Sequence, residues 1–170
     1  YDLGLDEEVV GITKFCIHPT QWFRTKMRVG DTKKLNLEKI KQLSPDLIIG
    51  NKEENDRWQV EELMKHYPVW MSDIKNLVEA LSMITSIGEM VGKQNEAVEL
   101  TEKIQSGFNK LRTLNKEPRT KKIELRTLYL IWKDPCMTVN KTTFIHDMLS
   151  ECGFKNVVAE FPSRYPELTA

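Results

Sequence analysis

The sequence predicts an α/β protein made of two small lobes with parallel sheets, joined by one long α-helix. Short apolar or β-branched runs alternate with helical patterns in the first half of the chain, which is typical of parallel α/β units. A long and highly charged helical pattern follows at residues 93–114. Strand and helix patterns then resume, which indicates a second lobe.

The composition limits the classes of protein to which the chain can belong. Its 170 residues, 40% hydrophobic and 29% charged, are enough for one domain or two small lobes with real cores. The 25 basic and 25 acidic residues cancel, so the chain has no overall field that would gather nucleic acid. The longest apolar runs, such as residues 128–132, fall far short of the ~20 residues that span a bilayer. The three cysteines form no CxxC pair and leave the redox compartment open.

The first half contains three predicted strands, at residues 9–12, 47–49 and 69–71. Between the first two runs, Asn36 can cap a helix that Ser44-Pro45-Asp46 then stops. Between the second and third runs, a helix is predicted over residues 56–66. We therefore expect compact, right-handed crossovers between parallel strands.

Two successive helices are predicted next, one starting at Leu77 and one covering residues 93–114 after Gly92. The second has a narrow apolar stripe and many charges, as expected of a helix that connects two parts of a protein. The polar segment 115–120 after it is the best domain boundary. The expected division is an N-terminal lobe at 1–92, a connecting helix at 93–114 and a partial C-terminal lobe at 115–170.

The predicted second lobe begins with a long strand over residues 123–132 and a short one over 137–139. An apolar helical stripe then runs from Ile145 to Cys152 and ends at Gly153, followed by a strand at Val157-Val158. Thr169 could cap a further helix, so we expect this lobe to be incomplete.

The segment Thr13 to Pro19 is the strongest local candidate for a binding site, because it follows the first predicted strand directly. Ligands of open α/β sheets bind at the carboxyl ends of the strands. Cys16 and His18 are two residues apart, so an extended loop could present both to a metal centre. The alternative is a buried thiol beside a hydrogen-bonded imidazole. Lys14 and Phe15 belong to the same candidate ligand site.

The tryptophans divide into two groups, Trp58 and Trp70, for which we expect core packing, and Trp22 and Trp132, which fit the core and a ligand cleft equally well. His66 and His146 are expected to be structural or solvated. In the loop after the second strand, Glu53 and Glu54 suit an acidic docking spot better than a catalytic dyad, because no third catalytic group is apparent.

Other familiar sites are missing from the sequence. Gly30-Asp31-Thr32-Lys33 matches neither the Walker pattern nor the dinucleotide pattern. The histidines stand near no hydrolase elbow and no HExxH helix. No catalytic residues are predicted, and we expect no enzymatic activity and no resident cofactor.

Four segments together resemble the helical-backbone solute-binding proteins of ABC importers: Val9 to Cys16, Leu37-Glu38-Lys39-Ile40 with Ser44 to Ile49, Asn51 to Asn55, and Tyr67-Pro68-Val69-Trp70. The resemblance covers nearly the whole chain and is to the cobalamin-, haem- and siderophore-binding type, closest to the cobalamin branch. It implies two α/β lobes joined by one long helix, with a metal chelate captured between them. The chelate implied first is a corrinoid, followed by a ferric siderophore or haem.

The resemblance also implies a partner and a location. Glutamates on the two lobes would dock onto arginines of an inner-membrane permease, with Glu53 and Glu54 in the matching first-lobe loop and Glu167 as a candidate in the second. Some cobalamin binders carry an aromatic residue at the position of Asn51. The location implied is the periplasm, either free or as a membrane-anchored lipoprotein facing it, with the signal segment outside the residues given.

The resemblance further implies a strand before Tyr1 and a strand-helix set after Ala170. Without the first strand, a sheet edge or core face would be exposed, so we expect self-association. Two alternatives belong to other classes: a two-lobed α/β enzyme or metal-insertion protein, and a cytosolic interaction module.

Overall fold

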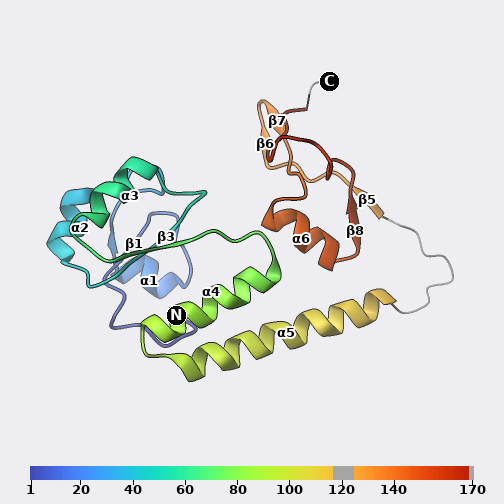
Figure 1. The fold of residues 1–170 in the computed structure, drawn as a ribbon. Helices are drawn as coiled ribbons and strands as arrows, with labels where there is room; N and C mark the ends of the chain where they lie inside the picture. The colour runs from blue at the N-terminus through green and yellow to red at the C-terminus, as the bar shows by residue number, and fades with distance from the viewer. Residues whose placement is uncertain (117–124, 169–170) are drawn as a thin grey trace. The chain divides into compact units, whose positions relative to one another are not determined.

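The computed structural model describes residues 1–116 and 125–168 of the chain. Their contacts group into two compact units, Tyr1–Asp73 and Ile74–Ala170. Both units are mixed α/β, and the second also contains the two longest helices (Figure 1). This grouping places both helices with the second unit, whereas the sequence divided the chain at 92 and 114. The three-part division stays a prediction.

The first unit contains two pairs of parallel strands. Its elements are β1 (Gly11–Ile12), α1 (Thr20–Thr25), β2 (Met27–Arg28), α2 (Leu37–Leu43), β3 (Ile48–Asn51), α3 (Arg57–Met64) and β4 (Val69–Ser72). The parallel pairing of β3 with β4 across α3 confirms the predicted crossover. Among the described residues β1 pairs with β2 and not with β3, and neither α1 nor β2 was predicted.

Two helices of the first unit, α2 and α3, begin at side-chain caps, and the cap at Asn36 was predicted. The Asn36 side chain accepts a hydrogen bond from the Lys39 N–H, and the Asp56 side chain accepts one from the Trp58 N–H. Each satisfies a backbone donor that the first helical turn leaves without a partner. Ser44 ends α2 in the left-handed conformation, at φ +46°. Pro45 follows it, and a proline disfavours the helical conformation of the residue before it.

The core of the first unit is small and mostly aliphatic. Its buried apolar residues are Leu3, Leu5, Ile12, Trp22, Ile40 and Leu63. The Trp22 indole donates to Asp6 Oδ1 at 2.7 Å and meets the ring of Tyr1 edge to face. A buried indole N–H needs such a partner, so Trp22 anchors the chain before β1 onto α1.

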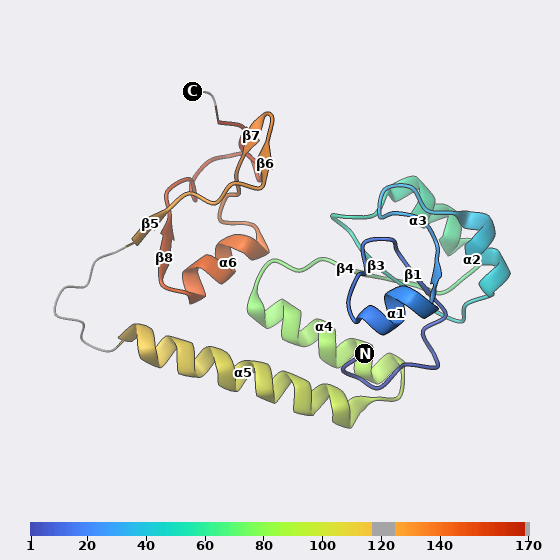
Figure 2. The same cartoon turned by 180° about the vertical axis from the view of Figure 1, so that it is seen from behind.

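The second unit combines a helix pair with a small α/β block, as two opposite views show (Figures 1 and 2). The pair is α4 (Leu77–Met90) and α5 (Gln94–Lys116); the block contains β5 (Leu125–Thr127), β6 (Trp132–Lys133), β7 (Cys136–Met137), α6 (Phe144–Glu151) and β8 (Phe154–Asn156). The two long helices confirm the predicted pair. Gly92 turns the chain between them at φ +69°, a conformation that glycine adopts without strain.

Three strand predictions in the second unit are corrected. The predicted strand 123–132 is regular only at β5 and again at β6, and its first two residues lie outside the described part of the chain. β5 ends at Thr127, where its pairing with the parallel strand β8 ends, because the backbone groups of a strand need hydrogen-bond partners. Beyond it, β6 and β7 form a local antiparallel hairpin. The predicted strand 137–139 is shortened to β7 and shifted toward the hairpin turn.

The predicted strand at Val157-Val158 is also displaced, since β8 ends at Asn156. The buried Asn156 side chain donates to Val139 O at 2.9 Å and accepts from Val158 N at 3.2 Å. These bonds turn the chain where the apolar pair would otherwise continue the strand. None of the helices in the two described stretches has both the length and the apolar character that crossing a membrane requires.

Candidate functional site

The loops that follow the first unit's strands are tied to one another by charged and polar contacts. After β1, Lys14 N donates to Gly30 O at 2.8 Å, and Lys14 Nζ forms an ion pair with Asp31 at 3.0 Å. Asp31 also accepts the backbone N–H groups of Lys33 and Lys34. The loops after β1 and β2 therefore lie together at the carboxyl edge.

Asp31 is the electrostatic centre of this first contact. Its hydrogen bond to Lys14 is the main cause that lowers its pKa, desolvation opposes that effect, and the backbone donors of Lys34 and Lys33 add to it. Both bonding and the nearby positive charge favour the ionised carboxylate. Asp31 thus stays negative near neutral pH and keeps Lys14 in place.

The loop after β3 is shaped by the side chain of Asn51. Its Oδ1 accepts the backbone N–H groups of Glu53 at 2.9 Å and Glu54 at 3.2 Å, and its Nδ2 donates to Ser72 Oγ at 3.1 Å. Asn55 Oδ1 in turn accepts from Asn51 N at 2.8 Å. An amide supplies both an acceptor and a donor, so Asn51 serves the loop's own geometry where some cobalamin binders are expected to have an aromatic ring.

Three further contacts join this loop to its neighbours. Lys33 Nζ donates to Glu53 O at 2.6 Å, and Asn55 Nδ2 donates to Thr32 O at 3.1 Å. Lys52 forms an ion pair with Asp73 at 2.7 Å, just after β4. All four post-strand segments of the first unit thus form one polar assembly. Lys14 and Glu53 were predicted for ligand binding and permease docking, but sequence reasoning missed the contacts of Lys33, Lys52 and Asn55, which only their place in loops could have suggested.

Two large apolar side chains stand exposed in the loop after β1. Phe15 is 61% exposed and Ile17 is 54% exposed, and Lys14 Nζ lies 5.0 Å from the centre of the Phe15 ring. Exposed apolar groups beside charged ones are typical of surfaces that bind a ligand or partner. The predicted site residues Lys14 and Phe15 are therefore placed together at this edge.

Cys16 and His18 share this loop. Cys16 is half-buried and His18 is exposed. The Cys16 thiol donates to the His18 carbonyl oxygen at 3.5 Å, a contact within the loop. Within residues 1–116 and 125–168, no group of three or more His, Cys, Asp or Glu side chains is placed to hold a metal ion. Metal-chelate contact by this pair stays a prediction.

One of the four tryptophans, Trp58, lies differently from the expectation. Trp22 is buried in the first unit's core, whereas Trp132 is 63% exposed, with its indole donating to Asp134 O at 3.0 Å. Trp70 is half-buried, but Trp58 is 60% exposed. The expected core packing of Trp58 is wrong, because its position at the start of α3 turns it away from the buried Gln59 and Leu63.

The predicted docking glutamates are on the surface. Glu53 and Glu54 are both exposed in the loop that Asn51 shapes, and Glu53 O is held by Lys33. In the second unit, Glu167 is exposed and forms an isolated antiparallel bridge with Met137.

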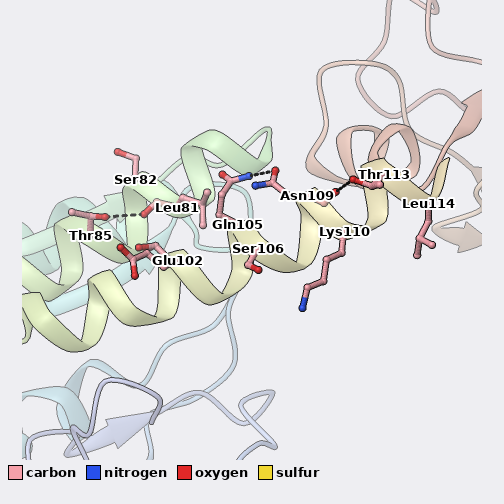
Figure 3. Close-up of a pocket in the computed structure, with 11 residues that line it drawn as sticks. Leu81, Ser82, Thr85, Glu102, Gln105, Ser106, Asn109, Lys110, Thr113 and Leu114 are labelled. Atoms are coloured by element: carbon pink, nitrogen blue, oxygen red, sulfur yellow. Dashed lines mark hydrogen bonds between the residues drawn. The ribbon is translucent and has the colours of Figure 1, made fainter. Parts of the chain in front are cut away.

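The second unit carries a groove of about 990 Å³ between α4 and α5 (Figure 3). Most of the lining residues are polar in type, but most of the surface that they present to the groove is apolar. They are Leu81, Ser82, Thr85, Thr101, Glu102, Gln105, Ser106, Asn109, Lys110, Thr113 and Leu114. The periodicity that located these helices concerned their apolar stripes, so it did not point to this groove. A second cavity of about 640 Å³ is bordered by His146, Ser150 and β8. There His146 Nδ1 lies 3.2 Å from Asn156 Nδ2, in keeping with its expected structural role.

Curated proteins similar to this chain include two bacterial binding proteins. An uncharacterized ABC transporter substrate-binding lipoprotein, YvrC of Bacillus subtilis (strain 168), is 27% identical over 94% of this chain and 52% of that protein. A vitamin B12-binding protein of Pectobacterium carotovorum is 22% identical over 99% of this chain and 60% of that protein. The chain thus spans between 52% and 60% of the length of these two relatives.

Solved structures support the fold. The vitamin B12-binding protein BtuF of Vibrio cholerae superposes with a TM-score of 0.85 at 22% identity, over 99% of this chain and 65% of that one. A periplasmic haem-binding protein from Pseudomonas aeruginosa has a TM-score of 0.87 at 18% identity, over 99% of this chain and 61% of that one. The fold is therefore the helical-backbone α/β fold that the sequence predicted.

A family model described as "Periplasmic binding protein" matches residues 1–167, which is nearly the whole chain. The chain belongs to the periplasmic binding protein family.

Proposed function

We propose that this protein is the solute-binding component of an ABC importer, which captures a metal chelate and delivers it to a membrane permease. The observation that carries the proposal is the polar assembly at the carboxyl edge of the first unit. There the loops after the strands are fixed by Lys14–Asp31, Lys33–Glu53 and Lys52–Asp73 contacts, beside the exposed Phe15. Preformed loops with a few apolar side chains suit ligand capture, because little ordering is left for binding to accomplish.

A corrinoid is the chelate that we propose first, with a ferric siderophore or haem next. All three are bulky chelates that combine apolar surfaces with polar groups at the periphery, and the edge offers apolar Phe15 and Ile17 beside Lys14. His18 and Cys16 add an imidazole and a thiol, both ligands of transition metals. Several relatives are named as B12-binding or haem-binding proteins, which supports this class of ligand without choosing between its members.

The proposed partner is a membrane permease, and the proposed place of action is the periplasm. Glu53 and Glu54 present exposed carboxylates on a fixed loop, which suits steering toward a basic permease surface. The protein would act in the periplasm or as a lipoprotein facing it, since one relative is named a lipoprotein and others are named periplasmic. Capture and release of a ligand need no catalytic group, so we propose no enzymatic activity.

Native mass spectrometry of the purified protein tests the proposal, followed by titration with cobalamin and with haem. Tryptophan fluorescence reports binding, because Trp58 and Trp132 are exposed. Saturable quenching at a single stoichiometric site by either chelate supports the proposal. If a different small molecule copurifies with the protein and neither chelate quenches its tryptophan fluorescence, the proposed ligand class is wrong. A turnover product in the spectrum would favour the two-lobed enzyme or metal-insertion alternative, and capture of a cytosolic protein alone would favour the interaction module.

A further inference from the structure

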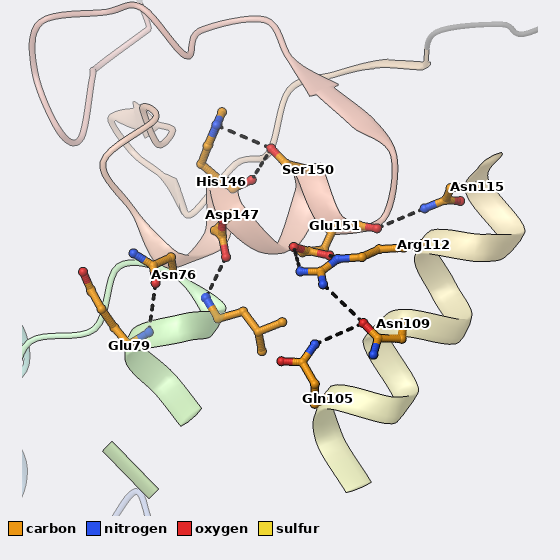
Figure 4. A network of polar contacts seen from close by, with 11 residues as sticks. Asn76, Glu79, Gln105, Asn109, Arg112, Asn115, His146, Asp147, Ser150 and Glu151 are labelled. Atoms are coloured by element: carbon orange, nitrogen blue, oxygen red, sulfur yellow. Dashed lines mark hydrogen bonds and ion pairs between the residues drawn. The ribbon is translucent and has the colours of Figure 1, made fainter. Parts of the chain in front are cut away.

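Two acidic side chains of α6 reach out of the α/β block of the second unit to the helix pair (Figure 4). Asp147 and Glu151 are four residues apart on α6, so they lie on one face of the helix, one turn from each other. Asp147 contacts the start of α4 and Glu151 contacts the C-terminal part of α5. One helix face is thus attached at two points to two different helices.

The contact with α5 is a two-pronged ion pair. Arg112 Nε and Nη2 donate to the two oxygens of Glu151 at 2.7 and 2.5 Å. Its Nη1 also lies 3.4 Å from Asn109 Oδ1, which orients the guanidinium from its own helix. The Glu151 side chain is only 16% exposed, so solvent competes less with this pair than with one on an open surface. A bidentate fork fixes direction as well as distance.

The same end of α6 is held by a neighbouring backbone contact. Asn115 Nδ2 donates to Glu151 O at 3.0 Å. A side chain built at Gly153 would come within 3.3 Å of Asn115, so the chain after α6 passes close to α5. Two residues of α5, one turn apart, therefore hold the last turn of α6.

In the contact with α4, Asp147 of α6 accepts a hydrogen bond from a backbone N–H at the start of α4. Asp147 Oδ2 accepts the Leu77 N–H at 2.7 Å. Two neighbouring residues form the local cap: the Asn76 side chain accepts from Glu79 N at 2.9 Å, and the Glu79 side chain accepts from Lys75 N at 2.6 Å. The first turn of a helix leaves its N–H groups without partners and attracts negative charge. Here a carboxylate 70 residues away in the chain supplies the acceptor.

We propose that Asp147, Glu151 and Arg112 form a latch that fixes the α/β block of the second unit on its helix pair, and that they are positioning residues for ligand binding. The latch makes residues 74–116 and 125–168 move as one body, which keeps the segment after β5, with the exposed candidate ligand residue Trp132, in a constant place. A binding site that depends on this segment then keeps its geometry while its ligand is absent. The ligand part of this inference rests on the proposed function, and the mechanical part does not.

Spin-label distances within the second unit test the latch. One label is placed on the native thiol of Cys136, with Cys16→Ser and Cys152→Ser, and the other on α5 at Glu99→Cys; both positions are exposed. The latch predicts a narrow distance distribution in this background. Arg112→Ala and Asp147→Ala should each widen it, by about twofold when combined, because two anchored contacts hold the block. Arg112→Lys should fall between, since it keeps the charge and loses the fork.

Lys141→Ala is the matched control. Its ion pair with Glu160 has the same 2.5 Å separation as that of Arg112 and Glu151, but both of its residues belong to the α/β block. It should leave the distribution narrow. Circular dichroism shows whether each variant keeps its helices; if Arg112→Ala does not fold, the comparison of Arg112→Lys with Lys141→Ala decides. An unchanged width in the folded variants would overturn the latch.

Chelate affinity tests the positioning role, with the latch substitutions made in the protein that keeps Cys16, Cys136, Cys152 and Glu99. Arg112→Ala should weaken binding about tenfold through lost preorganisation, with Arg112→Lys partly restoring it. Unchanged affinity together with a widened distribution would overturn the positioning role. If the unaltered protein binds neither cobalamin nor haem, the ligand part falls with the proposed function, while the distances still decide the latch.

Discussion

At the scale of single residues, the loop after β1 concentrates the groups with metal-binding chemistry. Cys16 is half-buried and its thiol donates a hydrogen bond to the His18 carbonyl oxygen, whereas His18 is exposed. The imidazole is therefore the more accessible of the two groups for a chelate. Its neighbours Phe15 and Ile17 supply apolar contact area on the same loop.

We expect His18→Ala to weaken binding of the preferred chelate by at least ~1 kcal/mol, about fivefold, the cost of losing a polar partner at a bound site. Titration followed by tryptophan quenching measures the change. His66→Ala is the control, since His66 is an exposed histidine next to Glu62 on α3. Equal affinity of His18→Ala and the unaltered protein would make the imidazole structural only.

The Arg112–Glu151 pair gives a pH dependence with a defined sign. The hydrogen bond to Arg112 is the main cause that lowers the pKa of Glu151 below its ordinary value of 4.5, against desolvation. A carboxyl whose folded pKa is depressed adds stability that is fully present above its unfolded pKa and is lost as the pH falls through the folded one. Glu151→Gln should therefore lower the free energy of unfolding at pH 7, and the difference should shrink below about pH 4.5. Urea unfolding from pH 7 to pH 3 measures it, and a difference that persists undiminished at pH 3 would contradict the ionic origin.

At the scale of elements, α4 and α5 pack closely where Gly88 faces Ala97. A Cβ built on Gly88 would stand 2.4 Å from the Ala97 Cβ and 2.9 Å from Lys93 O. Lys93 N donates to Gly88 O at 2.7 Å and Ala97 N donates to Lys93 O at 3.0 Å, so the crowded atoms have little room to shift. Glycine is required here by the approach of the second helix.

Gly88→Ala should destabilise the protein by about 1–3 kcal/mol, because it overpacks this contact. Gly107→Ala on α5 is the matched control, since a Cβ there meets no atom within 4 Å. It should stabilise by about 0.5–1 kcal/mol through its better helix propensity. Urea unfolding of both variants checks the opposite signs, and a neutral Gly88→Ala would show that the helices can separate at no cost.

The loop after β3 is the element that carries the docking prediction. Asn51 Oδ1 accepts the backbone N–H groups of Glu53 and Glu54, and these two bonds do not involve the carboxylates that the variant changes. Glu53→Lys with Glu54→Lys should abolish uptake of the ligand in cells while changing its affinity by no more than about threefold, because rim charges act mainly on steering. Glu89→Lys, at an exposed position on α4, is the control. A large loss of affinity in the double variant would move these residues into the ligand site.

Helices with a sustained apolar periodicity or a capping residue could be predicted from the sequence. Short strands that exist only because they pair with a distant strand could not. Asn36, Asp56 and Gly92 mark helix ends by local chemistry. In contrast, β2 has two residues and becomes a strand only by pairing with β1. The sequence predicted one long strand over residues 123–132, but the length of β5 is set by its partner β8, which lies elsewhere in the chain. Contacts such as Lys33–Glu53 and Asp147–Leu77 join distant segments, so sequence spacing leaves no trace of them.

At the scale of the whole molecule, one run of large apolar side chains in the second unit stands exposed. The run Leu128, Tyr129 and Leu130 is 45%, 45% and 53% exposed, and Trp132 beside it is 63% exposed. Contiguous exposed apolar patches mark surfaces that associate. The parallel pairs β1–β2, β3–β4 and β5–β8 each contain two strands within the described residues, so each strand also has an edge that can recruit another chain.

We therefore expect the 170-residue chain to self-associate as its concentration rises. Leu128→Lys with Leu130→Lys should shift it toward the monomer, because two charges in an apolar contact oppose its desolvation. Val78→Lys is the control, since Val78 is 74% exposed on α4, away in sequence from this run. Light scattering coupled to size-exclusion chromatography over a range of concentrations measures the mass. A monomer at all concentrations in the unaltered chain would contradict the expectation, and self-association that survives the double lysine change would move the contact to the strand edges.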